Sequence, residues 1–499
     1  MNTLWSALAA GADGDAALIA PERARLTYAE LREQVRRTAD ALAGVGVSRT
    51  DRVALVLPNG AEAVIGFLGA ALAATAAPLN PGYTEEEFRF YLEDTSARVM
   101  IVPKGDAEAA RAARLSDTLL LEASMDPTHG FLLEHDGKPL PAGEAGEPAP
   151  DDVALILHTS GTTSRPKRVP LTHANLAASI GNIIATYALG PSDVSLCVMP
   201  LFHVHGLLAS TLSTLGSGGV VVAPARFHPL RFWPVAEEFG ATWYSAVPTI
   251  HQLLLSRLKD GERPKGAATL RFARSCSSAL PPDTMLQLEE RLGIPVLEAY
   301  GMTEASHQMA SNPLPPGRRI PGSVGQGTGV AVAIMDEPGN LLATGVTGEV
   351  VIQGPNVTLG YENNAEANAA GFTKGWFRTG DLGSLDAEGY LTLLGRIKEL
   401  INRGGEKISP REVDELLLQH PAVAEAVSFG AAHPVWGEEV AAAVVLSSPA
   451  TEAELQRFCR EHLADFKCPK KIYVVEAIPR TATGKVQRRH VAAAFGGGS

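Results

Sequence analysis

Residues 153–167 read Val-Ala-Leu-Ile-Leu-His-Thr-Ser-Gly-Thr-Thr-Ser-Arg-Pro-Lys, an apolar run followed by a loop crowded with hydroxyl groups. The run Val153–Leu157 is typical of a buried strand. A hydroxyl-rich loop directly after such a strand offers backbone N–H groups, O–H donors and positive charge to a polyphosphate. It is not a Walker loop, because no Gly-Lys-Ser/Thr follows at the required offset. By itself this composition is also compatible with an ordinary surface loop. Residues elsewhere in the chain are needed to distinguish a phosphate-binding loop from a surface loop.

Apolar strand-like runs alternate with helical patterns on both sides of this stretch. Such alternation predicts an α/β architecture, with a large N-terminal domain of stacked, mostly parallel sheets flanked by helices. The range 28–45 shows the apolar stripe of a helix, and Thr27 with Glu30 predicts a capping box at its start. The strand-like runs are 53–57, 99–102, 153–157, 194–199, 220–223 and 242–247.

The composition excludes several classes of protein. At 499 residues the chain is too long for one hydrophobic core, and its net charge of -12 argues against general nucleic-acid binding. The uncharged stretch 63–79, rich in Ala and Gly, is too short to span a bilayer and is predicted to be a buried helix. The cysteines are scattered without metal-ligand spacing, as in reduced cytosolic proteins. We therefore expect a cytoplasmic protein, monomeric or weakly dimeric, with no membrane or nucleic-acid partner.

A second, smaller domain is predicted towards the C-terminus. The segment Gly395–Lys398 follows a strand-like run, 390–394, and precedes a new α+β pattern. Ser409 and Glu412 predict a capped helix start. Strand-like runs at 440–446 and 472–476 and a helical pattern at 452–463 complete a compact unit. The predicted organisation is an N-terminal domain at 1–395, a hinge at 396–398, a mobile C-terminal α+β domain at 399–495 and a linker-like tail at 496–499.

Five further motifs follow the opening loop in a fixed order. Most are weak signals alone, but together they are specific. They are Tyr300–Glu304, Thr379–Asp381, Gly395–Glu399, Asn402–Lys407 and Pro479–Lys485. With these motifs, nearly the whole chain resembles the adenylate-forming superfamily of acyl-CoA synthetases, luciferases and peptide-synthetase adenylation domains. The resemblance implies an enzyme that uses ATP, Mg²⁺ and coenzyme A to activate a small carboxylic acid and join it to a thiol.

The resemblance assigns the ATP-binding residues. Glu304 is expected to hold Mg²⁺, because a carboxylate beside phosphates needs a cation to offset the repulsion. Thr303 is expected to contact the α-phosphate and Tyr300 to stack on adenine, while Asp381 and Arg396 are expected at the ribose. The other expected nucleotide contacts are Thr159, Ser160, Gly161, Thr162, Thr163 and Lys167 in the opening loop, together with Ser278 and Ala279.

The resemblance also implies two half-reactions at one site. Lys485 is expected to act in adenylation. Gly404 and Gly405 are expected to face coenzyme A, since paired glycines let the backbone approach a narrow pantetheine arm closely. Lys398 is the expected hinge about which the small domain turns between the two steps. His203 matches the family's gating histidine beside the acyl pocket.

Several segments also carry information on the acid. They are Pro200–Gly206, Trp243–His251, Ser275–Leu280 and Glu304–His307. These segments resemble one subgroup, the oxalate–CoA ligases of plants and yeast. Buried oxalate presents a second carboxylate that must be paired. His307 and Ser277 are expected to donate to it, with His205 as a further candidate, whereas a fatty or aromatic acid would need an apolar lining.

Three alternatives stay open at this point. The acid could be another short or dicarboxylic acid, such as malonate or a 2-oxo or 2-hydroxy acid. It could also be a medium-chain or aryl acid. The third alternative is an adenylate-binding protein without catalysis, and the presence of Glu304, Asp381, Arg396 and Lys485 counts against it.

Arg168 departs from the family pattern, in which the phosphate loop continues Pro-Lys-Gly. Arginine adopts a positive φ only at a cost. Either the turn is altered here, or this residue does not need a positive φ. The guanidinium could also add phosphate affinity.

Overall fold

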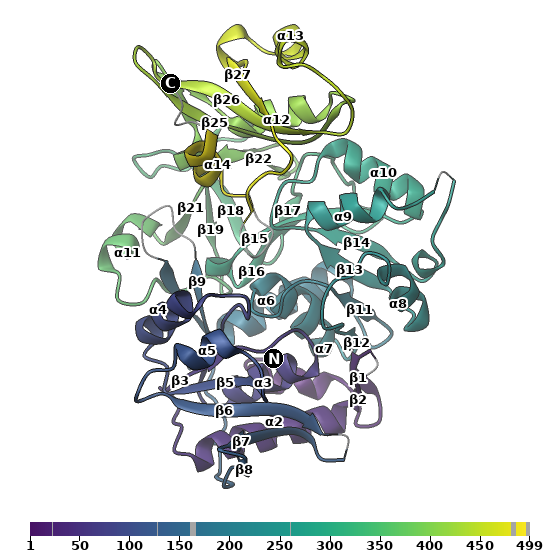
Figure 1. Ribbon diagram of the computed structural model, residues 1–499, viewed down its shortest axis with the longest axis vertical. Coiled ribbons are helices and arrows are strands. Elements are labelled where there is room, and N and C mark those ends of the chain that lie inside the picture. Colours follow the sequence, from purple (N-terminus) through teal and green to yellow (C-terminus); the bar gives the residue numbers. More distant parts are fainter. Residues whose placement is uncertain (22, 127, 160–165, 260, 481–485, 496–499) are drawn as a thin grey trace. The chain divides into compact units, whose positions relative to one another are not determined.

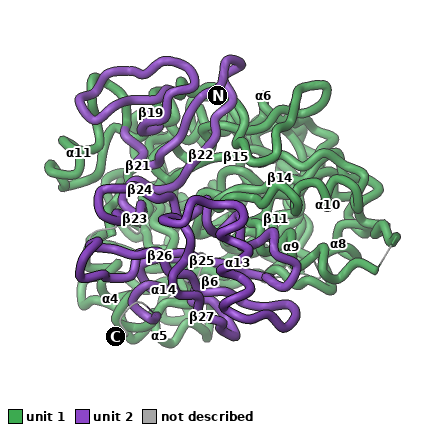
Figure 2. The backbone as a smooth tube through the Cα atoms, turned by 90° about the horizontal axis from the view of Figure 1, so that it is seen from above, with its two compact units in different colours: residues 1–332, 352–377 green, residues 333–351, 378–499 purple. Residues whose placement is uncertain are grey.

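The computed structural model describes residues 1–21, 23–126, 128–159, 166–259, 261–480 and 486–495. The chain forms two compact units, which are coloured separately in Figure 2. The first comprises Met1–Val332 and Ile352–Phe377, and the second comprises Ala333–Val351 and Arg378–Ser499. The second unit thus includes strands that precede the predicted boundary at 395, because these strands pair with one another. A hinge at 396–398 stays a prediction.

The first sheet contains β9, the strand that leads into the predicted phosphate loop. Its central strands are parallel, as predicted, and antiparallel strands close both ends. Helix α2 (Tyr28–Gly44) begins with the predicted capping box. Helix α3 (Ala61–Ala73) is buried along its whole length, and the rest of the predicted helix 63–79 is the buried strand β4. No helix in the described ranges has both the length and the apolar content to cross a bilayer. The sheet order is β10 (Lys167–Thr172), β9 (Val153–Thr159), β4 (Thr75–Pro78), β3 (Arg52–Leu55), β5 (Val99–Pro103), β6 (Leu119–Asp126), β7 (Gly130–His135) and β8 (Lys138–Pro139), with helices α4 (Glu85–Thr95) and α5 (Glu108–Ala112) beside it (Figure 1).

The second sheet has a continuous parallel core from β1 and β12 to β15. Helix α6 (His173–Tyr187) contacts β9 and β10 of the first sheet and β16 of the second, so the two sheets stack around it. The parallel arrangement brings the carboxyl ends of β13, β14 and β15 to one edge. The sheet order is β17 (Gln326–Gly327), β16 (His307–Ser311), β15 (Val296–Met302), β14 (Phe272–Ser275), β13 (Trp243–Ala246), β11 (Val194–Cys197), β12 (Val220–Val222), β1 (Ala16–Ala20) and β2 (Ala24–Thr27), with helices α8 (Phe232–Glu238), α9 (Pro248–Leu255) and α10 (Pro282–Leu292).

The C-terminal part of the chain is α+β, as predicted. Its helices pack on a five-stranded sheet around Ile401, Val413, Leu417 and Val440. The first helix of this part begins at Pro410 with Ser409 at its N-cap position, as predicted. The expected capping hydrogen bond is not formed, because the Ser409 hydroxyl donates to the Leu394 carbonyl instead. The elements are β18 (Ala331–Met335), β19 (Gly348–Gln353), β20 (Phe372–Thr373), β21 (Trp376–Leu385), β22 (Leu391–Arg396), β23 (Ile401–Arg403), β24 (Glu406–Ile408), α12 (Pro410–Leu418), β25 (Val423–His433), β26 (Gly437–Leu446), α13 (Glu452–His462), β27 (Lys471–Val474) and α14 (Arg488–Phe495).

Sequence patterns missed β25, one of the two longest strands of that sheet. Its sequence, Val-Ala-Glu-Ala-Val-Ser-Phe-Gly-Ala-Ala-His, contains few β-branched or aromatic residues and so has a low intrinsic preference for a strand. Pairing with β26 along its length stabilises it instead.

Candidate active site

Glu304 lies buried in a short 3₁₀ turn that follows β15. Its Oε1 accepts a hydrogen bond of 2.9 Å from the Tyr361 hydroxyl, and its carbonyl accepts the Thr358 N–H at 2.7 Å. No group of three or more His, Cys, Asp or Glu side chains in the described part of the chain could cage a metal. Mg²⁺ commonly binds one or two carboxylates plus substrate phosphates, so a single held carboxylate at this position fits the predicted role of Glu304.

The described ends of the predicted phosphate loop lie on one antiparallel strand pair of the first sheet. Thr159 on β9 lies opposite Lys167 on β10. The Lys167 ammonium lies 4.5 Å from the centre of the Tyr361 ring, whose hydroxyl bonds to Glu304. Tyr361, which sequence patterns did not reveal, thus connects the end of the loop to the predicted magnesium ligand. The predicted phosphate contacts Ser160, Gly161, Thr162 and Thr163 lie outside the described residues.

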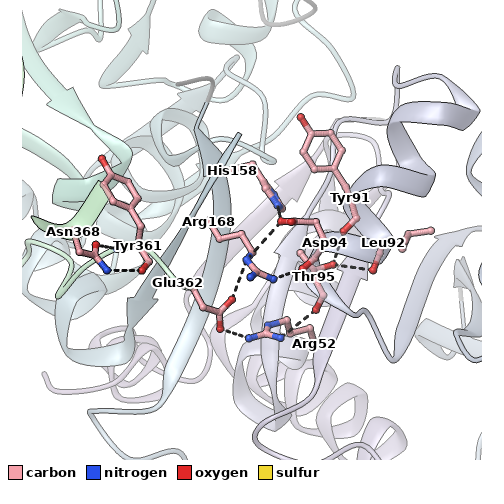
Figure 3. A network of polar contacts seen from close by, with 10 residues as sticks. All are labelled: Arg52, Tyr91, Leu92, Asp94, Thr95, His158, Arg168, Tyr361, Glu362 and Asn368. Carbon is pink, nitrogen blue, oxygen red and sulfur yellow. Dashed lines mark hydrogen bonds and ion pairs between the residues drawn. The ribbon is translucent and has the colours of Figure 1, made fainter. Parts of the chain in front are cut away.

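Arg168 belongs to an ion-pair network at the base of this loop (Figure 3). It lies on β10 opposite His158 and has no positive φ. Of the two alternatives for its backbone, the residue therefore does not need a positive φ. Its Nε lies 3.2 Å from a Glu362 oxygen and 3.6 Å from an Asp94 oxygen, and its Nη1 donates to the Asp94 carbonyl. His158 Nε2 bonds to Asp94 at 2.9 Å, and Arg52 pairs with Glu362. Two carboxylates therefore neutralise Arg168, which argues against its serving as an extra phosphate ligand.

The predicted acid-binding residues come together at the carboxyl edge of the second sheet. His205 bonds through Nδ1 to the Ser277 hydroxyl at 2.9 Å and through Nε2 to the Ser245 hydroxyl at 2.6 Å. The His205 and His307 rings stack with centres 5.3 Å apart. The structure therefore brings His205, Ser277 and His307 into one cluster, as the resemblance to oxalate–CoA ligases implied.

The backbone of this cluster is held in an uncommon conformation. Ser277, Ser306 and His307 all have positive φ, at 75°, 48° and 96°. Such angles are rare for residues with a side chain, and they concentrate at functional sites. Gly301 makes the tight turn possible, because a Cβ at this position would lie 2.1 Å from the His307 carbonyl oxygen.

Arg274 is the residue of this cluster that sequence patterns missed. It lies on β14 with no exposed surface, and it bonds to His307 Nε2 and Ser245 Oγ at 3.0 Å each. The available signal was a charged residue inside the strand Phe272–Ser275, whose residues are all buried, since burying a charge costs free energy unless the charge is paired or hydrogen-bonded. Burial, followed by the charge of Arg274, lowers the pKa of His205 and of His307 well below 6.5, so both rings are neutral at pH 7.

The other predicted site residues of the first unit also lie at or beyond the carboxyl ends of strands of the second sheet. His203 is in the turn that precedes the π-helix His205–Leu212, and its N–H donates to the Pro200 carbonyl. Tyr300 and Thr303 are buried around the end of β15. Ser278 and Ala279 continue the loop from Ser277 and are exposed.

In the second unit, two predicted ribose ligands meet across a strand pair. Asp381 on β21 lies opposite Arg396 on β22, and their side chains form an ion pair of 2.8 Å. Lys398 lies in the 3₁₀ turn Ile397–Glu399.

Gly404 and Gly405 form the tip of the β23–β24 hairpin with φ of 59° and 100°. A Cβ on Gly404 would meet the Trp436 ring at 2.8 Å. The short distance to the Trp436 ring and the positive φ both explain why residue 404 is a glycine. Lys485 lies outside the described residues.

Comparison with known proteins adds an independent line of evidence. The profile of the family described as "AMP-binding enzyme" matches residues 6–362, and that of "AMP-binding enzyme C-terminal domain" matches residues 412–485. The chain is 50% identical over 484 residues to an oxalate–CoA ligase of Arabidopsis thaliana, covering 94% of this chain and 93% of that one. It is 48% identical over 480 residues to an oxalate–CoA ligase of Saccharomyces cerevisiae, covering 90% and 88%. The crystal structure of ATP-bound MatB from Rhodopseudomonas palustris matches with a TM-score of 0.90 and 31% identity, over 99% of both chains.

Proposed function

Because the chain belongs to the AMP-binding enzyme family, we propose that it is an ATP-dependent ligase that joins oxalate to coenzyme A. One oxalate carboxylate attacks the α-phosphorus of ATP, and pyrophosphate leaves with the electrons of the broken P–O bond. The coenzyme A thiol, after losing its proton, then adds to the acyl carbon of oxalyl-adenylate, and AMP leaves. The products are oxalyl-CoA, AMP and pyrophosphate.

The first step needs neutralisation of negative charge more than it needs a general base. The attacking carboxylate is already ionised, so the barrier lies in bringing two anions together in the right geometry. Lys167 contributes a cation beside Tyr361, and Glu304 would hold Mg²⁺. When bound, Mg²⁺ supplies positive charge that offsets the repulsion between the phosphates and the attacking carboxylate.

The observation that carries the choice of acid is the polar cluster of His205, Ser277 and His307 with Arg274 behind it. Of these groups, Ser277 and His307 can donate hydrogen bonds to a second carboxylate, which must be paired once it is buried. The predicted contact of His205 with the acid is replaced by its two bonds to Ser277 and Ser245. A long apolar or aromatic acid would leave the two donors without partners. The identity to oxalate–CoA ligases over nearly the whole chain supports the same choice.

The roles of individual residues follow the family pattern. Lys485 acts in adenylation, Thr303 contacts the α-phosphate and Tyr300 stacks on adenine. Asp381 and Arg396 bind the ribose, and His203 gates the acyl pocket. The remaining proposed roles are nucleotide contacts for Thr159, Ser160, Gly161, Thr162, Thr163, Ser278 and Ala279, coenzyme A contact for Gly404 and Gly405, and a hinge at Lys398.

We also propose that the protein acts in the cytoplasm as a monomer or weak dimer. All four cysteines are free and buried, which suits a reducing compartment. Light scattering coupled to size-exclusion chromatography tests the oligomeric state, and a mass above that of a dimer contradicts it.

The test of the function is pyrophosphate release measured with oxalate, malonate, glyoxylate, acetate, hexanoate and 4-coumarate, with and without coenzyme A. We expect the highest kcat/KM with oxalate, and oxalyl-CoA as the product when coenzyme A is present. A higher kcat/KM with malonate would indicate a different short acid. A higher value with hexanoate or 4-coumarate would contradict the proposed function.

A further inference from the structure

We propose that Arg274 is a specificity-determining positioning residue: its guanidinium orients two hydrogen-bond chains so that both present donors to the second carboxylate of the acid. The identity of that acid as oxalate rests on the proposed function above. The hydrogen-bond chains themselves rest only on the contacts of the buried side chains.

The starting observation is a buried cation surrounded by neutral partners. Arg274 Nε donates to the Tyr187 hydroxyl at 2.8 Å, and Nη1 donates to Ser245 at 3.0 Å. Nη2 donates to Gln308 Oε1 and to His307 Nε2, both at 3.0 Å. Within the described residues no carboxylate forms an ion pair with Arg274. A fully buried charge without a counter-ion is costly, so an anion is needed nearby to offset it.

Strand register explains why the protein does not supply that anion itself. Glu298 is the buried carboxylate on the neighbouring strand β15, and it pairs in register with Ser275 rather than with Arg274. Paired residues of adjacent strands point to the same face of a sheet, and successive residues alternate. Glu298 and Arg274 therefore lie on opposite faces, and Glu298 Oε1 accepts the Leu280 N–H at 2.9 Å instead.

The first chain of hydrogen bonds runs through His307. A guanidinium can only donate, so His307 Nε2 must accept from Arg274. The proton of the neutral ring is then on Nδ1. No hydrogen bond within the described residues uses His307 Nδ1, so this N–H is available to an acceptor on a ligand.

The second chain runs through Ser245 and His205. The Ser245 hydroxyl oxygen accepts from Arg274, and the hydroxyl is fully enclosed. Its only acceptor within the described residues is His205 Nε2, at 2.6 Å. His205 must then hold its proton on Nδ1 and donate it to Ser277 Oγ at 2.9 Å. The Ser277 hydroxyl proton is left to donate outward.

Both chains thus end in a donor, the Nδ1–H of His307 and the O–H of Ser277, and the stacked rings keep them close. Two donors backed by a cation suit a carboxylate, which only accepts hydrogen bonds. An aldehyde or methyl group in the same place gains less binding free energy, because it accepts weaker hydrogen bonds or none. Arg274 therefore favours an acid with a charged second end over a monocarboxylate of the same size.

The direct test compares Arg274→Gln with the wild-type enzyme on oxalate and on glyoxylate, which has an aldehyde in place of the second carboxylate. We expect KM for oxalate to rise about 10- to 100-fold, with a much smaller change for glyoxylate and an unchanged KM for ATP. Arg111→Gln is the matched control, because Arg111 pairs with Glu122 at 2.6 Å beside the first sheet and should leave all three values unchanged. Equal losses on both acids would overturn the proposal in favour of a structural role.

A second measurement tests the proposal on the wild-type protein, even if Arg274→Gln does not fold. Long-range ¹H–¹⁵N spectra of the wild-type protein with ¹⁵N-labelled histidine distinguish the two neutral tautomers, and His205→Gln and His307→Gln assign the signals. We expect the Nδ1–H tautomer for both residues. An Nε2–H tautomer at His307 would overturn the proposal.

The two proposals fail in different ways. If the wild-type enzyme prefers an acid other than oxalate, the proposed function fails, whatever the tautomers are. If the wild-type enzyme prefers oxalate but Arg274→Gln keeps the wild-type KM for oxalate, only the role of Arg274 fails.

Discussion

At the residue scale, the buried histidines determine how the protein responds to acid. Burial lowers the pKa of His173 and of His251 to about 4, and that of His205 and His307 well below 6.5. In the unfolded chain these rings take up a proton near pH 6.5, whereas in the folded chain they do not. Protons therefore favour the unfolded state. We expect the free energy of unfolding to fall from pH 6.5 towards about 4, by about 1.4 kcal/mol per pH unit for each such histidine.

Urea titrations at pH 7.5, 6.5 and 5.5 measure this slope. His251→Gln should reduce the slope below pH 6.5 by the share of one histidine, whatever it does to the absolute stability. A free energy of unfolding that is flat between pH 6.5 and pH 5.5 would contradict the expectation.

A single residue, His307, is also expected to contribute to recognition of the acid. We expect His307→Ala to raise KM for oxalate about tenfold or more, because it removes a donor next to a buried carboxylate. KM for ATP should stay close to the wild-type value. His129→Ala, at an exposed histidine, serves as the control, and an unchanged KM for oxalate in His307→Ala would exclude His307 from the acid site.

At the element scale, the β9–β10 pair forms the base of the predicted phosphate loop. Arg168 joins this base to α4 through Asp94 and to Glu362, the neighbour of Tyr361. We expect Arg168→Gly to lower the free energy of unfolding by about 1–2 kcal/mol, since the partly buried carboxylates of Asp94 and Glu362 each lose one of their partners. We also expect KM for ATP to rise severalfold, because the base of the loop is held less firmly.

Steady-state kinetics with varied ATP and urea unfolding measure both effects. Glu362→Gln combined with Arg168→Gly should cost less than the sum of the single changes, because the two side chains interact directly. A wild-type KM for ATP in Arg168→Gly would show that the network stabilises the fold without positioning the loop.

At the scale of the whole molecule, the two half-reactions are predicted to need different residues of the C-terminal part. We expect Lys485→Ala to abolish pyrophosphate release from ATP and oxalate, because it removes a cation from the step that joins two anions. Thioester formation from supplied oxalyl-adenylate should be largely retained. Measuring both half-reactions separately tests this, and an equal loss in both would contradict the predicted turn about Lys398.

Much of the fold could be predicted from local patterns, and the reaction class followed from the resemblance to the adenylate-forming superfamily. Strand and helix periods place β9, β11, β13 and α2 close to their observed bounds. The failures have a common cause, because β25 and the missing capping bond of α12 depend on contacts with distant residues: β25 on its pairing with β26, and Ser409 on the Leu394 carbonyl.

The functional groups of the site can be recognised in the amino-acid sequence, because each motif holds them in neighbouring residues: hydroxyl groups around His158–Lys167, a carboxylate in Tyr300–Glu304 and a lysine in Pro479–Lys485. The contacts between these groups become visible in the folded chain, such as those of Tyr361 with Glu304 and of Arg274 with His307. Local patterns do not specify such contacts, because they depend on strand register and on packing between segments far apart in the chain. Residue spacing gives the face on which a side chain lies, but not the partner that it finds there.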